Sequence, residues 1–144
     1  AALRRCRDRG AEGVVFGDVY LDDVRRYRES MLALEGFEAL FPLWGRRPEE
    51  VVAEFLRLGF RAVVTCVDGS VLDRSYVGRE LDEGFVESLP EGVDPCGERG
   101  EYHTFVYDGP VFARPVRVRA GGVVERVVGG RKFYYCDLEL GGPA

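Results

Sequence analysis

Apolar runs alternate with amphipathic segments along the first half of the chain. Residues 13–18 (GVVFGD), 37–44 (FEALFPLW) and 61–68 (RAVVTCVD) are short and mostly apolar, which is typical of buried strands. In residues 21–34, and again in residues 48–59, apolar side chains recur every three or four positions, as they do on one face of a helix. Strands that alternate with helices in this way indicate a parallel sheet that is covered on both faces.

The second half of the chain changes from a helical to an extended pattern. Residues 72–89 favour helix, with breaks at two glycines, and the segments that follow are predicted as strands at residues 104–107, 115–119, 122–128 and 132–140. The second and third of these strands are predicted to form a hairpin around a Gly-Gly pair. The last strand alternates between polar and apolar side chains, so it is predicted to be half-buried and antiparallel.

These patterns predict an α/β fold with two parts. Residues 1–89 supply the strands and helices of a parallel sheet, and residues 90–144 form a β-rich part with mixed or antiparallel strands. The length of 144 residues is enough for one domain with a substantial core.

Composition narrows the classes of function. The formal net charge of −5 argues against a general nucleic-acid binder, because such proteins usually carry a basic surface. The sequence has no apolar run long enough to span a membrane and no pattern typical of a signal peptide. The four cysteines lack the close pairing of zinc sites and disulfide scaffolds. We therefore expect a cytoplasmic protein without a membrane or nucleic-acid partner.

Most of the polar chemistry is concentrated in residues 92–110, GVDPCGERGEYHTFVYDGP. This segment contains Asp94, Glu98, Glu101 and the single histidine, His103, just before a predicted strand. Closely spaced carboxylates can form an anionic pocket for Mg²⁺, an ammonium group or an amine, and a histidine beside them can act as an acid or base. Solvated acids on a loop, together with a histidine that has a structural role, are the alternative interpretation.

Cys96 lies in the same segment and is a candidate nucleophile. Its neighbours are acidic, which raises the pKa of a thiol and makes it less reactive, so a packed thiol is the better interpretation. A zinc site that includes this cysteine is disfavoured, because paired thiol spacing is absent.

Other candidates lie near the ends of predicted elements. In a parallel sheet the ligand crevice lies beyond the carboxyl ends of the strands, where Asp18 and Asp68 stand. Arg28 and Glu29 on a predicted helix, and Glu80 in the sequence GRELD, are either site residues or members of solvated ion pairs.

Five segments of the chain resemble one known family. These segments are GVVFGDVYLDDVRRYRE, LFPLWGR, RAVVTCVD, GRELDEGF and GVDPCGERGEYHTFVYDGPVF. They are similar, in the same order, to the later part of the diphthine–ammonia ligase family. This family belongs to the N-type ATP pyrophosphatases of the adenine nucleotide α-hydrolase superfamily. The resemblance implies that residues 1–89 are the end of a Rossmann-like nucleotide-binding domain.

The resemblance also implies a chemistry. Family members adenylate a carboxylate with ATP and Mg²⁺, release pyrophosphate, and let ammonia displace AMP to form an amide. Their phosphate-binding loop has the sequence SGGKDS, which does not occur in this chain. We therefore expect the chain to be the later part of a longer enzyme, inactive alone and weak in binding ATP.

The variant at the loop bears on the acceptor. In family members that make diphthamide, this loop is similar to EGGE followed by an aromatic residue, a Glu and a Thr. This chain has His103 in place of the Glu that follows the aromatic residue. The form E-x-G-E-Y-H-T resembles the bacterial branch of the family, so we expect the amidation chemistry to be retained and the acceptor to differ from diphthine.

The resemblance assigns roles to individual residues. Glu98, Glu101 and His103 are expected to be catalytic. The residues expected to bind substrates are Asp18, Arg28, Glu29, Glu80, Asp94, Gly100 and Thr104. The expected partners are ammonia and a small-molecule or protein carboxylate, and a homo-oligomer is an expected assembly. The alternative function is a non-catalytic module, derived from this family, for small-molecule binding or assembly.

Overall fold

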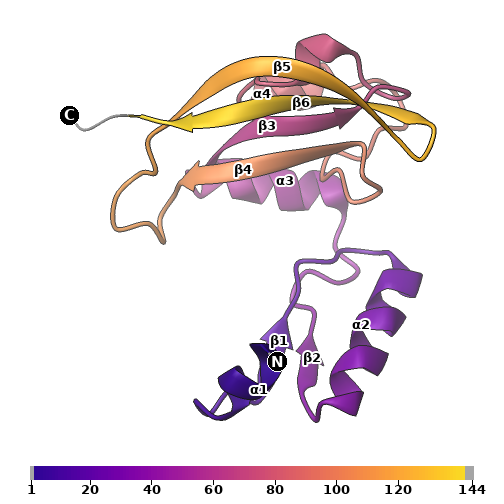
Figure 1. The fold of residues 1–144 in the computed structure, drawn as a ribbon, viewed down its shortest axis with the longest axis vertical. Helices are drawn as coiled ribbons and strands as arrows, with labels where there is room; N and C mark the ends of the chain where they lie inside the picture. The colour runs from indigo at the N-terminus through magenta and orange to yellow at the C-terminus, as the bar shows by residue number, and fades with distance from the viewer. Residues whose placement is uncertain (1, 142–144) are drawn as a thin grey trace. The chain divides into compact units, whose positions relative to one another are not determined.

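The computed structural model describes residues 2–141 (Figure 1). The chain forms two compact units that divide between Arg47 and Pro48. We call the part up to Arg47 unit 1 and the part from Pro48 onward unit 2. Each unit has its own strands and helices, and each is described by itself.

Unit 1 contains a two-stranded parallel sheet. Its elements are α1 (Ala2–Arg7), β1 (Gly13–Val15), α2 (Asp22–Leu34) and β2 (Glu38–Leu40). Strands β1 and β2 pair in parallel, and the helix α2 connects them, so the predicted strand–helix–strand order is confirmed here. Strand β2 ends at Leu40, before Pro42, as expected for a residue that is unfavourable inside a strand.

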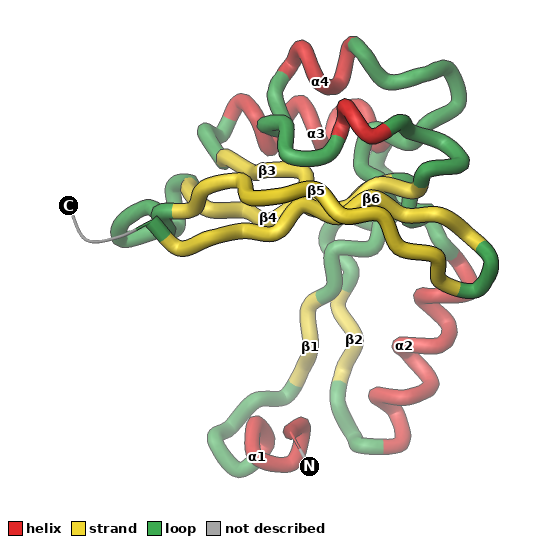
Figure 2. The backbone as a smooth tube through the Cα atoms, turned by 45° about the horizontal axis from the view of Figure 1, so that its top comes forward, coloured by secondary structure: helices red, strands yellow, loops and turns green. Residues whose placement is uncertain are grey.

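Unit 2 is built on a four-stranded antiparallel sheet in the order β4-β3-β6-β5. Its elements are α3 (Pro48–Arg57), β3 (Arg61–Asp68), the 3₁₀ helix η1 (Arg74–Tyr76), α4 (Glu83–Glu87), β4 (Tyr102–Asp108), β5 (Val118–Val128) and β6 (Arg131–Leu140). Figure 2 shows α3 and α4 on the same face of this sheet. The final strand is half-buried and antiparallel, as its alternating sequence predicted.

The core of unit 2 lies between the sheet and the two helices. Val64 and Val67 of β3 are fully buried there, together with Phe85 of α4. The ring of Phe85 meets the ring of Tyr102 edge-on, with 5.2 Å between their centroids. Because Tyr102 is the first residue of β4, this contact fixes the start of that strand against the helix layer.

The prediction that residues 61–68 form a third parallel strand is wrong. Strand β3 pairs with β4 and β6, and both pairings are antiparallel. The strand reads as a continuous apolar run because it is a central strand in which consecutive residues are buried, among them Val63 and Val64. Burial on both faces produces the same apolar pattern in either type of sheet.

Two further sequence predictions need correction. Residues 72–89 hold only η1 and α4, because the segment around Gly78 instead runs beside β3, where Gly78 N and Val64 O are 2.8 Å apart. Residues 115–128 do not form a hairpin: they contain one strand, β5, with an irregularity between Ala120 and Val123. The hairpin is formed by β5 and β6, and its turn is Gly129-Gly130.

The expected division into residues 1–89 and 90–144 stays a prediction about domains, although β3 shares its sheet with strands beyond that boundary. Among the described residues, no helix is both long and apolar enough to cross a membrane.

Candidate functional site

The polar loop before β4 is organised by the side chain of Asp94. Its Oδ1 accepts a hydrogen bond of 2.8 Å from Cys96 N, and its Oδ2 accepts one of 3.1 Å from Glu98 N. Asp94 is only 4% exposed. An aspartate that bonds to backbone amides a few residues ahead makes a tight turn, so Asp94 fixes the path of the next four residues.

Glycine is required at Gly97, inside this turn. Its φ is +64°, and a Cβ atom at this position would lie 2.8 Å from the carbonyl oxygen of Tyr102. A side chain would therefore be strained by the backbone and would also collide with β4. The loop can approach the start of β4 this closely only because residue 97 has no side chain.

Glu101 is a buried carboxylate with one oxygen bonded and the other free. Glu101 is only 6% exposed. Its Oε1 accepts hydrogen bonds from Asp94 N at 3.2 Å and from Arg99 Nε at 3.1 Å. Its Oε2 is buried without a hydrogen-bond partner among the described residues. Because burial without a partner is costly for a charged oxygen, Oε2 is suited to accept a hydrogen bond from a ligand.

Arg99 holds Glu101 and the start of the loop together. Besides its contact with Glu101, it donates a hydrogen bond of 2.8 Å from Nη2 to the carbonyl oxygen of Gly92. The sequence interpretation did not include this residue. Its place between two acids, Glu98 and Glu101, was the signal that could have identified it.

His103 and Thr104 follow on strand β4, and both are exposed. His103 pairs with Cys66 across the ladder, and Thr104 pairs with Val64. Neighbouring residues of a strand point to opposite faces, so the side chains of His103 and Thr104 lie on different faces of the sheet. Glu101 directly precedes β4, two positions before His103, but it is buried whereas His103 is exposed.

Glu80 is held by Tyr107, near the end of β4, and by Arg61, at the start of β3. The hydroxyl group of Tyr107 donates a hydrogen bond to Glu80, and Arg61 forms an ion pair with Glu80 at 3.6 Å. Burial, the hydrogen bond to Glu80 and the negative charge of Glu80 together raise the pKa of Tyr107 to about 12. Sequence reasoning missed Tyr107 and Arg61, although Tyr107 shares a strand with His103.

Cys96 is not an activated thiol. Burial is the main cause that raises its pKa, to about 12, and the negative charges of Asp94 and Glu98 add to the effect. Its Sγ lies 3.2 Å from the carbonyl oxygen of Pro48, to which it donates a hydrogen bond. The expectation of a packed, unreactive thiol is confirmed.

Three further predicted residues, Asp18, Arg28 and Glu29, belong to unit 1. Arg28 contacts both carboxylate oxygens of Asp18, with Nε 2.6 Å from Oδ2 and Nη2 3.0 Å from Oδ1. The guanidinium of Arg28 also lies over the ring of Phe16, 4.5 Å from its centroid. Glu29 instead pairs with Arg25 at 2.8 Å, one turn away on α2. Asp18 and Arg28 are thus brought together, and Glu29 belongs to a separate pair.

In unit 2 the structure connects four of the predicted residues within one loop: Asp94, Glu98, Gly100 and Glu101. The convergence of Glu98, Glu101 and His103 on one solvent-reachable pocket stays a prediction, and Glu101 itself is largely covered. Within the part of the chain that the structure describes, no group of three His, Cys, Asp or Glu side chains is arranged to hold a metal ion.

These features define an α/β protein in which a glycine-punctuated acidic loop leads into an antiparallel sheet. Residues 47–136 match the diphthamide synthase C-terminal domain family. The match covers the polar loop, β3, β4 and most of β6, so the chain belongs to this family.

Several relatives carry the same name. The chain is 33% identical over 119 residues to diphthine–ammonia ligase of Bos taurus and to that of Homo sapiens, and each alignment covers 78% of this chain and 44% of the relative. The diphthine–ammonia ligase of Schizosaccharomyces pombe is 29% identical over 122 residues, which are 82% of this chain and 20% of that protein. The chain thus spans less than half the length of these relatives.

Proposed function

We propose that this chain is the ammonia- and acceptor-binding part of an ATP-dependent ligase that converts a carboxylate into an amide. The name shared by the relatives, diphthine–ammonia ligase, supports ammonia as the nitrogen donor. The observation that carries the proposal is the buried Glu101 Oε2, which has no hydrogen-bond partner among the described residues.

The loop is suited to hold an ammonium ion. Residues 94–101 contain three carboxylates and one arginine, and the excess negative charge attracts a small cation. Asp94 N and Arg99 fix the Glu101 carboxylate through Oε1, so Oε2 stays in one position and can accept an N–H bond from ammonium. A fixed acceptor spends no free energy on reorganisation when the ligand binds.

Ammonium must lose a proton before it can attack a carbonyl carbon, because only neutral ammonia has a free electron pair. Glu101 and His103 are the proposed acceptors of that proton, since Glu101 directly precedes β4 and His103 is the second residue of that strand. His103 is exposed, so it can pass the proton on to solvent. The nitrogen then attacks the activated carboxylate, and AMP leaves with the electrons of the broken C–O bond.

The residues of this chain fit ammonia better than they fit the other expected cofactors. ATP activates the acceptor carboxylate, but the chain contains no SGGKDS-type loop to hold its phosphates. The described carboxylates also do not group into a site for Mg²⁺. We therefore assign activation to other parts of the complete enzyme and only amide formation to this loop. The proposed role of Asp18 and Arg28 is to contact the nucleotide side.

The acceptor is proposed to be a carboxylate that binds beside the polar loop. Glu80, Glu98, Gly100 and Thr104 are the proposed contacts for it, with Asp94 shaping the loop. Diphthine is the acceptor that the relatives' name states. Family members that make diphthamide have a Glu at the position of His103. The acceptor of this protein is therefore proposed to be another carboxylate. We place the reaction in the cytoplasm.

Ammonium binding by the chain itself tests the proposal. In ¹³C-detected NMR, addition of ammonium chloride should move the carboxyl resonance of Glu101 and saturate, because ammonium contacts Oε2. Tetramethylammonium chloride carries the same charge but has no N–H group, so it should leave that resonance unchanged. If both salts have the same effect, the shift reports ionic strength alone and the proposal is wrong.

Activity of the complete enzyme provides the second test. Glu101→Gln should leave folding intact and lower the rate of ammonium-dependent AMP release by on the order of 10²–10⁴, the usual loss for one acid–base group. Glu91→Gln is the matched control, because Glu91 is an exposed acid at the beginning of the same loop. Equal rates for the two variants would remove Glu101 from the mechanism.

A further inference from the structure

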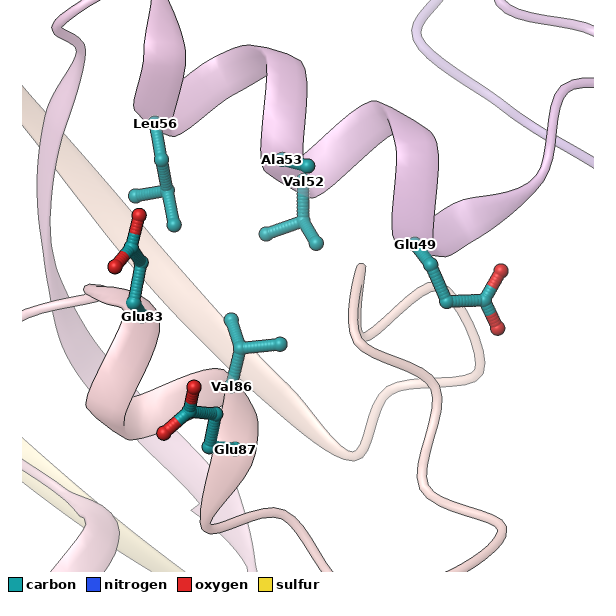
Figure 3. Close-up of a pocket in the computed structure, with 7 residues that line it drawn as sticks. All are labelled: Glu49, Val52, Ala53, Leu56, Glu83, Val86 and Glu87. Carbon is teal, nitrogen blue, oxygen red and sulfur yellow. The ribbon is translucent and has the colours of Figure 1, made fainter.

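A cavity of about 210 Å³ lies between α3 and α4, on the helix layer of unit 2 (Figure 3). The residues that line it are Glu49, Val52, Ala53, Leu56, Glu83, Val86 and Glu87. None of them belongs to the polar loop before β4, and the proposed ligase chemistry uses none of them. The cavity is therefore a separate feature that needs its own explanation.

The floor of this cavity is apolar. Val52, Ala53 and Leu56 come from one face of α3, and Val86 faces them from α4 (Figure 3). Val52 is only 5% exposed and belongs to the core, so the floor is fixed by the packing beneath it. Apolar side chains that remain accessible in a concave surface are suited to cover an aliphatic group.

The rim of the cavity is acidic. Glu49 stands at one end on α3, and Glu83 and Glu87 project from α4 (Figure 3). No lysine or arginine is among the residues that line the cavity. Glu83 and Glu87 form no ion pair among the described residues, whereas the exposed Glu80, Glu125 and Glu139 each pair with an arginine or lysine. Their charges are thus available to a cation from outside.

We propose that this cavity is a docking site for a partner protein that inserts one arginine or lysine side chain. Such side chains have an aliphatic stem and a charged head, which complement the apolar floor and the acidic rim respectively. The volume agrees with one side chain: drug-sized ligands occupy pockets of roughly 300–1,000 Å³, whereas a cavity of about 150 Å³ accommodates one benzene ring.

A titration of the isotope-labelled chain with N-acetyl-argininamide tests this proposal. This probe has the arginine side chain and no other charge. We expect saturating shifts of the backbone amides in residues 49–56 and 83–87, with a Kd of roughly millimolar order for a single side chain. N-acetyl-citrullinamide has nearly the same shape without the charge, and it should bind several-fold more weakly. Equal binding of the two probes, or no saturating shift, would overturn the proposal.

Variants separate the rim from general electrostatic attraction. The double substitution Glu83→Gln and Glu87→Gln should weaken binding of the arginine probe about three- to tenfold, as expected for two partly solvated ion pairs. Glu38→Gln removes an exposed acid in unit 1 and should leave the affinity unchanged. An equal loss per removed charge in both variants would show that only net charge matters and would contradict the proposal. Shifts of the same amides on raising the protein concentration without probe would assign the cavity to a second copy instead.

Discussion

Unit 2 carries two groups of carboxylates whose surroundings are opposite. In the polar loop, Asp94 and Glu101 are 4% and 6% exposed, and each is bonded to backbone amides or to a guanidinium. Beside the cavity between α3 and α4, Glu83 and Glu87 are exposed and form no ion pair among the described residues. The first group makes the hydrogen bonds that hold the loop in place, whereas the second group lies on the surface.

The difference shows which carboxylates are held in one position by the surrounding structure. Removing a carboxylate from water costs several kcal/mol, so it stays charged in the interior only when fixed donors compensate. Such a group is held in one geometry, as catalysis requires. An exposed carboxylate keeps its hydration and its freedom, so it contributes a local field that a partner can use. Loss of a member should therefore have unequal effects in the two groups.

The largest effect on stability is expected from Asp94→Ala. The change removes an acceptor from the amides of Cys96 and Glu98, and it opens a space in the buried loop. Since a hydrogen bond to a charged group contributes about 1.5–3 kcal/mol, the free energy of unfolding should fall by about 3 kcal/mol. Urea denaturation measures this change, and Glu87→Ala is the control from the exposed group.

A smaller loss is expected from Gly97→Ala. Gly92 and Gly97 both have positive φ, but a Cβ at Gly92 has no atom within 4 Å, whereas a Cβ at Gly97 meets Tyr102 O at 2.8 Å. Each alanine should cost about 1 kcal/mol through backbone strain, and Gly97→Ala should cost about 1 kcal/mol more through the collision. If the two variants unfold at the same urea concentration, the loop does not need its close approach to β4.

The hydrogen bond from Tyr107 to Glu80 depends on pH, unlike the contacts of the loop described above. Its pKa is raised from 10.0 to about 12 by burial, the hydrogen bond to Glu80 and the charge of Glu80. The protonated phenol is the form that donates to Glu80, so its stabilisation is fully present below pH 10 and is lost between pH 10 and about 12. Phenolate absorbance of the wild type minus that of Tyr107→Phe should give this titration. In Glu80→Gln its midpoint should fall, and an unchanged midpoint would contradict the assigned cause.

The smallest change is expected from Glu83→Gln and Glu87→Gln, measured as stability without any probe. Both side chains are exposed and unpaired among the described residues, so each substitution should change the free energy of unfolding by less than about 0.5 kcal/mol. A loss comparable to that of Asp94→Ala would mean that these acids are structural, and the contrast between the two groups would disappear.

The parts of the fold that the sequence predicted correctly are those with a strong local pattern. Helix α2, helix α3 and strand β6 follow from the spacing of their apolar side chains. The partner of a strand is not encoded locally, so β3 was assigned to the wrong sheet. The segment around Gly78 was expected to be helical, and its hydrogen bonds to β3, far away in the sequence, overrode the local preference.

The candidate site shows the same limit. Asp94, Glu98 and Glu101 could be found because they are close together in the sequence and separated by glycines. The roles of Arg61 and Tyr107 could not be found in this way, because Glu80 meets them only when its own segment and β4 both lie beside β3. The pairing of Asp18 with Arg28 likewise depends on how α2 returns beside β1.

The strand order β4-β3-β6-β5 has a consequence for synthesis on the ribosome. Strand β3 ends at Asp68, and one of its two neighbours, β6, is completed only at Leu140. A nascent chain that has released β3 must therefore wait for some seventy further residues before the central strand has both partners. During that interval an apolar strand has an open edge, which is the kind of surface that chaperones bind and that aggregation uses. Truncation before β6 should leave the chain in this state permanently, because residues 133–135 of β6 are the ones that pair with Asp68, Val67 and Cys66 of β3.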